Sequence, residues 1–190
     1  MGLRVIEPQP PDPTWPRYST HPFPSYRFLP GNNPHPRRDS RGHSFGKPEP
    51  KPSGFRPAEW HKSEEYLYGI DLYNYAYWWE CHEIFEGLWH AVGRDTEQGN
   101  FFQALIQLAA ANLKYFLGNP AAAHNLFQKG IIRLQHVPPS YMGIDVPRLT
   151  DALQAHLINP HPHTPLIGLS PTAREAGNGG RFQVPSATGE

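Results

Sequence analysis

Prolines divide this chain into a part that cannot form regular helices and a part that can. Fourteen of the 23 prolines lie in residues 1–57, and none lies between Ala58 and Asn119. Proline lacks a backbone N–H and its ring clashes with the preceding turn, so it interrupts helix interiors. The sequence therefore predicts three parts, which are an arm over residues 1–57, a folded domain over 58–158 and a tail over 159–190.

Formal charge follows the same division. Residues 1–57 carry nine basic and four acidic side chains, residues 58–158 carry six and eleven, and the whole chain sums to zero. A chain without net charge has little general attraction for nucleic acid, so we regard nucleic acid as an unlikely partner. The opposite charges of the first two parts predict instead that the arm binds the domain of its own chain, with its arginines paired to the domain's acids.

Cysteine content and hydropathy exclude several classes of protein. The one cysteine, Cys81, permits neither an intramolecular disulfide nor a zinc site built from cysteines. No apolar run has the length of a membrane span, and the N-terminus has no signal-peptide pattern. We therefore expect a cytoplasmic protein that does not bind membranes. Its partner is expected to be a small molecule or a protein, neither of which the sequence identifies, and its oligomeric state stays open.

The middle of the chain has the apolar spacing of helices, with apolar residues at intervals of three and four. Capping residues, glycines and prolines mark where the helices begin and end. The expected helices are about 58–73, about 76–92 after a joint at Asn74, a third from the N-cap Asp95 to about residue 117, a fourth from the N-cap Asn119 to about residue 135, and a fifth between Asp145 and Pro160.

Short connections between these helices favour antiparallel neighbours, so the expected fold is all-α, an up-and-down bundle of four to five helices. The arm contains many aromatic residues for a solvated linker, and we expect it to lie extended along the bundle from about residue 22 to 57. The tail is rich in glycine and proline, and we expect it to be flexible or loosely attached.

The chemistry of the chain concentrates on the expected second helix. At 100° per residue, Glu86 lies about 40° from His82 and both fall within a stripe of tryptophans, whereas Glu83 borders that stripe and Glu80 faces water. A carboxylate among tryptophans must be paired, protonated or bound to a metal. The stripe comprises Trp78, Trp79 and Trp89.

Three kinds of partner are open for this carboxylate. Glu86 can pair with His82, supported by Gln103 or Gln107 of the third helix. It can pair with the histidines and arginines of the arm. It can also bind one divalent metal ion together with His82 and the arm histidines His35 or His43, because imidazole and carboxylate suit zinc, manganese or iron(II). A di-iron centre is excluded because the third and fourth helices carry no acidic residue between Asn100 and Gln135.

Three segments carry a resemblance to a known family. These are Gly69–Asn74, the stretch Trp78–Trp79–Glu80–Cys81–His82–Glu83–Ile84–Phe85–Glu86–Gly87–Leu88–Trp89, and Gln103–Ala110. Together they resemble Domain of Unknown Function family 309 over about residues 60–135. This resemblance implies a small all-helical, mainly prokaryotic protein and no established activity. The departures are Cys81 for the usual alanine, Gly87 for a common second glutamate and Ala104 for the usual glycine.

The residues leave the function, and whether the protein is an enzyme, open between three hypotheses. The first is a metal-assisted or acid–base hydrolase, with Glu83 or Glu86 as general base, His82 as ligand or acid, and a small anionic substrate. The second is a non-catalytic interaction or scaffold module in which the His/Glu cluster is structural. The third is RNA or DNA contact through the basic arm. The substrate-binding residues expected for the first are Arg37, Arg38, Trp78, Trp89 and Gln107.

Overall fold

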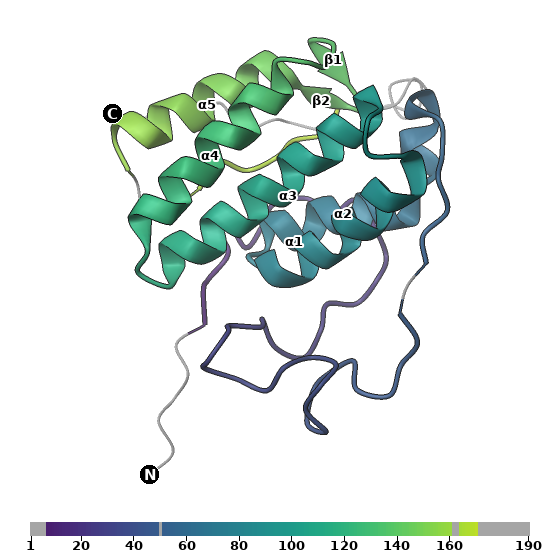
Figure 1. The fold of residues 1–190 in the computed structure, drawn as a ribbon, viewed down its shortest axis with the longest axis vertical. Coiled ribbons are helices and arrows are strands. Elements are labelled where there is room, and N and C mark those ends of the chain that lie inside the picture. The colour runs from purple at the N-terminus through teal and green to yellow at the C-terminus, as the bar shows by residue number, and fades with distance from the viewer. Residues whose placement is uncertain (1–6, 50, 161–163, 171–190) are drawn as a thin grey trace.

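The fold is helical, as the sequence predicts. The computed structural model describes residues 7–49, 51–160 and 164–170, and its elements are shown in Figure 1. In chain order they are η1 (Pro57–Lys62), α1 (Glu64–Asn74), α2 (Trp78–Val92), α3 (Glu97–Phe116), α4 (Pro120–Leu134), β1 (Ser140–Tyr141), β2 (Ile144–Asp145) and α5 (Val146–Ile158).

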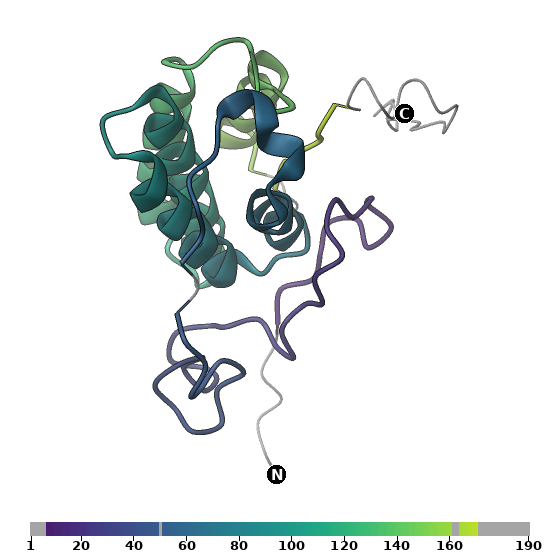
Figure 2. The same ribbon diagram turned by 90° about the vertical axis from the view of Figure 1, so that its right-hand side faces the viewer.

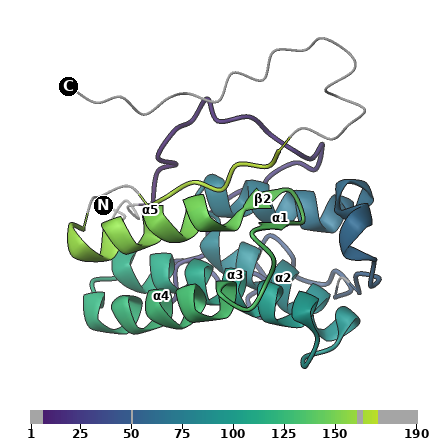
Figure 3. The ribbon, with the colours of Figure 1, turned by 90° about the horizontal axis from the view of Figure 1, so that it is seen from above.

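Helices that are neighbours in sequence are also neighbours in space. α1 packs on α2, α2 on α3, α3 on α4 and α4 on α5 (Figures 1 and 3). This arrangement confirms the predicted up-and-down bundle. Its core is dense in aromatic rings, and each fully buried side chain of this size stabilises the fold by about 1.5–3 kcal/mol. The largest fully buried residues include Tyr66, Tyr73, Phe85, Phe101, Phe102 and Phe127.

The first predicted helix is divided in two. Pro57 begins the 3₁₀ helix η1, and Ser63 then takes an extended conformation with ψ 101°. The Ser63 side chain accepts a hydrogen bond from the Tyr66 N–H at 3.2 Å. The serine therefore caps a new helix, α1, where the apolar spacing alone predicted one continuous helix.

The joint between α1 and α2 lies where it was predicted. Asn74 is the last residue of α1, and Ala76 in the connection has a positive φ of 64°. Other boundaries also follow the capping residues, since Asn119 caps α4 and Asp145 caps α5. The third helix differs by one residue, because its N-cap is Thr96, whose hydroxyl accepts from the Gly99 N–H at 2.8 Å.

A two-residue hairpin between α4 and α5 was not predicted. Ser140 pairs with Asp145 and Tyr141 with Ile144, and the turn residues Met142 and Gly143 both have positive φ, at 48° and 82°. Such values are typical of a tight hairpin turn. Gly143 also lies against Trp60, and a Cβ atom at this position would come within 2.7 Å of the indole ring.

The arm lies against the bundle, as predicted, but contact begins earlier than residue 22. The hydroxyl of Tyr75 donates to the Trp15 carbonyl, and Arg17 pairs with Asp71 on α1 at 2.8 Å. In Figure 2 the arm, coloured purple to blue, runs beside α1 and continues in irregular turns before it returns to η1. Its earlier docking follows from polar contacts, which the aromatic content of the arm did not reveal.

Part of the tail is also docked, in contrast to the expected loose attachment. Ile167 is buried, and its backbone N–H and C=O both bond to the Asn74 side chain, at 2.8 and 2.9 Å. Leu169 N–H donates to the Tyr18 hydroxyl at 3.1 Å. The segment 164–170 therefore joins the arm to the α1–α2 joint, and the remainder of the expected tail, 161–163 and 171–190, lies outside the described residues.

In the part of the chain that the structure describes, no helix combines the length and apolarity needed to cross a membrane.

Candidate functional site

Helix α2 turns its most buried face away from the predicted site. Cys81, Phe85 and Leu88 have no exposed surface. At 100° per residue this face is centred about 90° from His82. His82 and Glu86 therefore lie at the edge of the core, where they are partly exposed, and the expectation of a buried His/Glu pair is wrong. The physical reason is that aromatic rings at the helix border, such as Trp89, are themselves only partly buried.

The structure does bring the three predicted catalytic residues together. Donor atoms of His82, Glu83 and Glu86 all lie within 4.8 Å of one another, and His82 Nδ1 lies 3.5 Å from a Glu83 carboxylate oxygen. The side chains of His82 and Glu83 are 33% and 40% exposed. Their position on successive turns of one helix places an imidazole and two carboxylates at a surface that solvent reaches.

These donors fit a single divalent ion with small adjustments. An ion about 2.1 Å from each donor keeps any two of them within about 4.2 Å. The observed limit of 4.8 Å exceeds this only slightly, and a side-chain rotation closes the difference. Three protein ligands would leave at least one coordination position for water, as in catalytic rather than structural sites.

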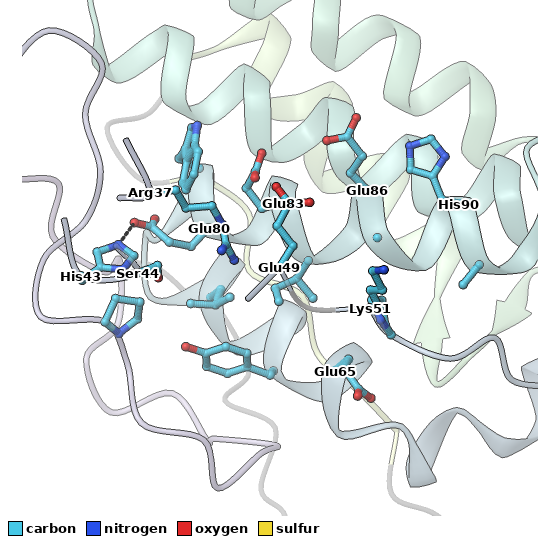
Figure 4. Close-up of a pocket in the computed structure, with 18 residues that line it drawn as sticks. Arg37, His43, Ser44, Glu49, Lys51, Glu65, Glu80, Glu83, Glu86 and His90 are labelled. Atoms are coloured by element: carbon cyan, nitrogen blue, oxygen red, sulfur yellow. Dashed lines mark hydrogen bonds and ion pairs between the residues drawn. The ribbon is translucent and has the colours of Figure 1, made fainter. Parts of the chain in front are cut away.

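Glu80 is the feature that the helical wheel placed wrongly. Its side chain is only 6% exposed, although it lies about 110° around α2 from the centre of the core face. One carboxylate oxygen, Oε1, accepts from the Phe28 N–H at 2.9 Å and lies 3.1 Å from His43 Nε2 (Figure 4). The arm covers this face of the helix, so a residue that would face water on a bare bundle becomes buried.

The arm histidines lie outside the cluster of three. His43 pairs with Glu80, and the His35 Nδ1 atom accepts from the backbone N–H groups of Arg37 and Arg38 at 3.2 and 3.3 Å. The His35 ring also packs against Trp79, with centroids 5.4 Å apart. Of the predicted metal-binding residues His82, Glu86, His35 and His43, the structure therefore brings only His82 and Glu86 together, with Glu83 beside them.

Arg17 of the arm pairs with a domain acid as predicted, but Arg37 and Arg41 do not. Arg37 donates to the backbone carbonyls of Lys47 and Pro48, at 3.2 and 3.4 Å. Arg41 pairs with Asp39 of the arm at 2.9 Å, and this guanidinium lowers the pKa of the Asp39 carboxyl to about 2. Local turns of the arm bring these groups together, so charge totals over whole segments did not identify the partners.

The remaining predicted substrate-binding residues lie apart from the cleft described below. Trp78 is buried and packs near Phe116, while Trp89 lies under the guanidinium of Arg94 at 4.8 Å from its ring centroid. Gln107 is partly buried, and its carbonyl oxygen has no partner among the described residues. Arg38 is exposed on the arm. Only Arg37 of the predicted set lines the cleft.

A cleft of about 710 Å³ lies between the arm, α1 and α2 (Figure 4). Glu83 and Glu86 belong to both the cluster and the cleft, so the two adjoin. Sequence reasoning missed the cleft because the arm forms one of its walls, and nothing in the local pattern fixes where an irregular segment docks. The charged and aromatic residues of its lining are Arg37, His43, Glu49, Lys51, Glu65, Tyr68, Trp79, Glu80, Glu83, Glu86 and His90.

Two other ionisable groups, the Cys81 thiol on α2 and the Tyr68 phenol on α1, stay protonated at neutral pH. Burial, with a smaller contribution from Glu80, raises the pKa of the Cys81 thiol well above its ordinary value, so Cys81 is not a nucleophile. Burial, followed by the charge of Glu80, raises the pKa of Tyr68 to about 12. The protonated phenol donates to the Pro22 carbonyl at 3.0 Å and so helps to hold the arm.

The fold and the cluster together define an all-α bundle protein with a set of metal-type donors on its second helix. The sequence model of the family described as "Domain of unknown function (DUF309)" matches residues 66–126, from α1 into the first half of α4. This match confirms the family resemblance carried by Gly69–Asn74, Trp78–Trp89 and Gln103–Ala110, all of which lie within the matched segment. No curated protein matches the chain.

Proposed function

We propose that the protein binds one divalent metal ion through His82, Glu83 and Glu86 and uses it to hydrolyse a substrate held in the adjoining cleft. The observation that supports this proposal most strongly is the convergence of one imidazole and two carboxylates within 4.8 Å. Imidazole and carboxylate donors together suit zinc, manganese or iron(II).

The exposure of the cluster favours a reaction over a structural role. A structural zinc site is closed by four protein ligands, whereas three ligands leave room for water. A bound ion would lower the pKa of that water to about 7 and so generate a nucleophile at neutral pH. Glu83 and Glu86 each offer one carboxylate oxygen as a ligand in this arrangement, so the second oxygen of either carboxylate is left to accept the proton of the water as general base.

The charge of the cleft favours a neutral or cationic substrate. Five glutamates line it, against the permanent cations Arg37 and Lys51. A negative potential of this kind repels an anion and concentrates cations. The small anionic substrate expected from Arg37 and Arg38 is therefore not the class that we propose.

Metal titration of the purified full chain tests the proposal. We expect Mn²⁺ or Zn²⁺ to bind in isothermal titration calorimetry with one ion per chain. Loss of one metal ligand costs more than loss of an outer-shell partner, so His82→Ala should weaken binding by more than about 100-fold. His90→Ala is the matched control, because His90 lies on the same helix and lines the cleft but is outside the cluster.

Two results would overturn the proposal. One is binding by His82→Ala that equals binding by the unchanged protein, and the other is the absence of stoichiometric binding for both metals. If metal binds, hydrolysis of a neutral ester such as p-nitrophenyl acetate should require the ion and should be lost in His82→Ala.

The two alternative functions make different predictions. A non-catalytic interaction module needs the cluster only for stability, so His82→Ala would lower Tm by several degrees in a protein that binds no metal. Nucleic-acid contact through the arm would need free cations, yet Arg17 and Arg41 are engaged by Asp71 and Asp39. The interaction module is thus the stronger alternative, and the same titration separates it from the metal site.

A further inference from the structure

Glu80 holds a buried carboxylate oxygen that the protein leaves without a partner. Its Oε1 atom accepts a hydrogen bond from the Phe28 N–H and is also hydrogen-bonded to His43 Nε2. Its Oε2 atom has no hydrogen-bond partner among the described residues. The side chain is 6% exposed and lines the cleft. A buried carboxylate oxygen without a donor is energetically unfavourable, and a ligand that brings a donor into the cleft relieves this cost.

The charged residues around Glu80 favour a positively charged ligand that donates hydrogen bonds. Besides Glu80, the cleft is lined by Glu49 from the arm, Glu65 from α1, and Glu83 and Glu86 from α2. The cations of the lining are fewer, and Arg37 is already engaged by backbone carbonyls of the arm. Charge-assisted hydrogen bonds to carboxylates are among the strongest available to a ligand with N–H donors.

The regular spacing of the carboxylates along α2 favours a linear ligand that carries several positive charges along its length. Glu80, Glu83 and Glu86 follow one another at three-residue intervals on α2, so successive Cα atoms rise by about 4.5 Å along the helix axis. Apolar and aromatic side chains lie among them, and a cation placed over an aromatic face is attracted to it. These walls are formed by Tyr68, Leu72, Trp79 and Ile84.

We infer that the cleft binds a linear aliphatic polyamine. One ammonium group donates to Oε2 of Glu80, and the following ammonium groups lie near Glu83 and Glu86. The methylene groups between them pack against Trp79 and Ile84. This site goes beyond the proposed metal-dependent reaction, because the polyamine contacts require no metal ion and centre on a residue outside the metal cluster.

Calorimetric titration of spermidine into the metal-free full chain tests this inference. We expect one spermidine per chain, and 1-butylamine, which has a single ammonium group, should bind at least about tenfold more weakly. Glu80→Gln keeps an acceptor for Phe28 and His43 but replaces the unpaired oxygen by an amide, and it should weaken spermidine binding about 10- to 100-fold. Glu64→Gln is the control, since it removes one exposed charge of α1 outside the cleft.

Equal spermidine affinity in Glu80→Gln and Glu64→Gln would overturn the inference. So would displacement of spermidine by Mg²⁺ at the same concentration of positive charge, because that result indicates a diffuse counterion effect. If Glu80→Gln does not fold, the double variant Glu49→Gln/Glu65→Gln takes its place. It should also lose about tenfold in affinity, and unchanged binding would count against the site.

The His82→Ala variant separates this inference from the proposed function. It removes a metal ligand that does not line the cleft, so it should abolish metal binding while leaving spermidine affinity within about twofold. Loss of both metal binding and spermidine binding in this variant would show that the polyamine site depends on the metal cluster, and it would contradict the inference.

Discussion

At the scale of single residues, Asp71 fixes the position of the arm. This carboxylate of α1 has no exposed surface and accepts hydrogen bonds only from the arm among the described residues. The donors are Arg17 Nε at 2.8 Å, Tyr18 N–H at 2.8 Å, Ser19 N–H at 2.9 Å and the Ser19 hydroxyl at 2.8 Å. Four donors around one buried charge offset its desolvation and define where residues 17–19 must lie.

We therefore expect Asp71→Asn to destabilise the protein. The variant keeps the shape of the side chain but removes the charge and turns one acceptor into a donor that faces other donors. Hydrogen bonds to charged groups contribute about 1.5–3 kcal/mol each, so a loss of about 3 kcal/mol is expected in urea unfolding. Asp39→Asn is the control, because solvent screens the surface pair Asp39–Arg41 and its loss should have a much smaller effect. Equal effects of the two substitutions would contradict this role of Asp71.

Four residues of α2 show how much of the candidate site could be predicted from the sequence. His82, Glu83 and Glu86 share one helix, and the 3.6-residue period was enough to predict that they lie together. Glu80 was predicted to face water by the same reasoning, because a helical wheel has no information about its partners His43 and Phe28, which lie 37 and 52 residues earlier in the chain. The signal that was available is that the arm carries three histidines, any of which could pair with a carboxylate on a helix face that the arm covers.

At the scale of elements, α2 is covered on two sides. Its core face packs against α1 and α3, and the arm residues 51–55 lie along its other side. Gly87 permits this approach, because a Cβ atom at this position would come within 3.0 Å of the Pro52 ring. A side chain at position 87 would therefore require Pro52 to move by a few tenths of an ångström.

We expect Gly87→Glu to lower Tm although it removes a glycine from a helix interior. The gain in helix propensity, up to about 1 kcal/mol, is outweighed when the new side chain displaces Pro52 and the segment around it. A double-mutant cycle with Pro52→Gly isolates the contact, and the coupling energy should be at least about 1 kcal/mol. Additive effects within about 0.5 kcal/mol would show that the arm does not pack against this position.

Helix boundaries were predicted well where a capping side chain coincides with a break in the apolar spacing, and poorly where the spacing continues across the cap. Asn119 and Asp145 each accept from a backbone N–H three residues later, at 3.1 Å in both cases. Ser63 was missed because the apolar spacing continues across it, and the hairpin at 140–145 was missed because two-residue strands leave almost no period to detect. Its turn depends on Gly143 lying against Trp60, which is a tertiary contact.

At the scale of the whole molecule, the described part of the arm and residues 164–170 pack as parts of the folded domain. The arm supplies partners to the buried acids Asp71 and Glu80, and residues 164–170 bond to both Asn74 and Tyr18. The zero net charge of the chain predicted that the arm would bind in cis, and this is confirmed. The contacts include the pairs Arg17–Asp71 and His43–Glu80 and several hydrogen bonds that involve backbone groups, whereas Arg37 and Arg41 bond within the arm.

This account makes the arm a wall of the cleft and a cover for α1 and α2, so its removal is the most direct test. Without residues 1–57 the two buried carboxylates lose their partners and apolar surface of α1 and α2 becomes exposed. Thermal unfolding by circular dichroism, with light scattering of the same sample, should show a protein that aggregates or melts at least about 10 °C below the full chain. A soluble, monodisperse truncation with the Tm of the full chain would contradict the account.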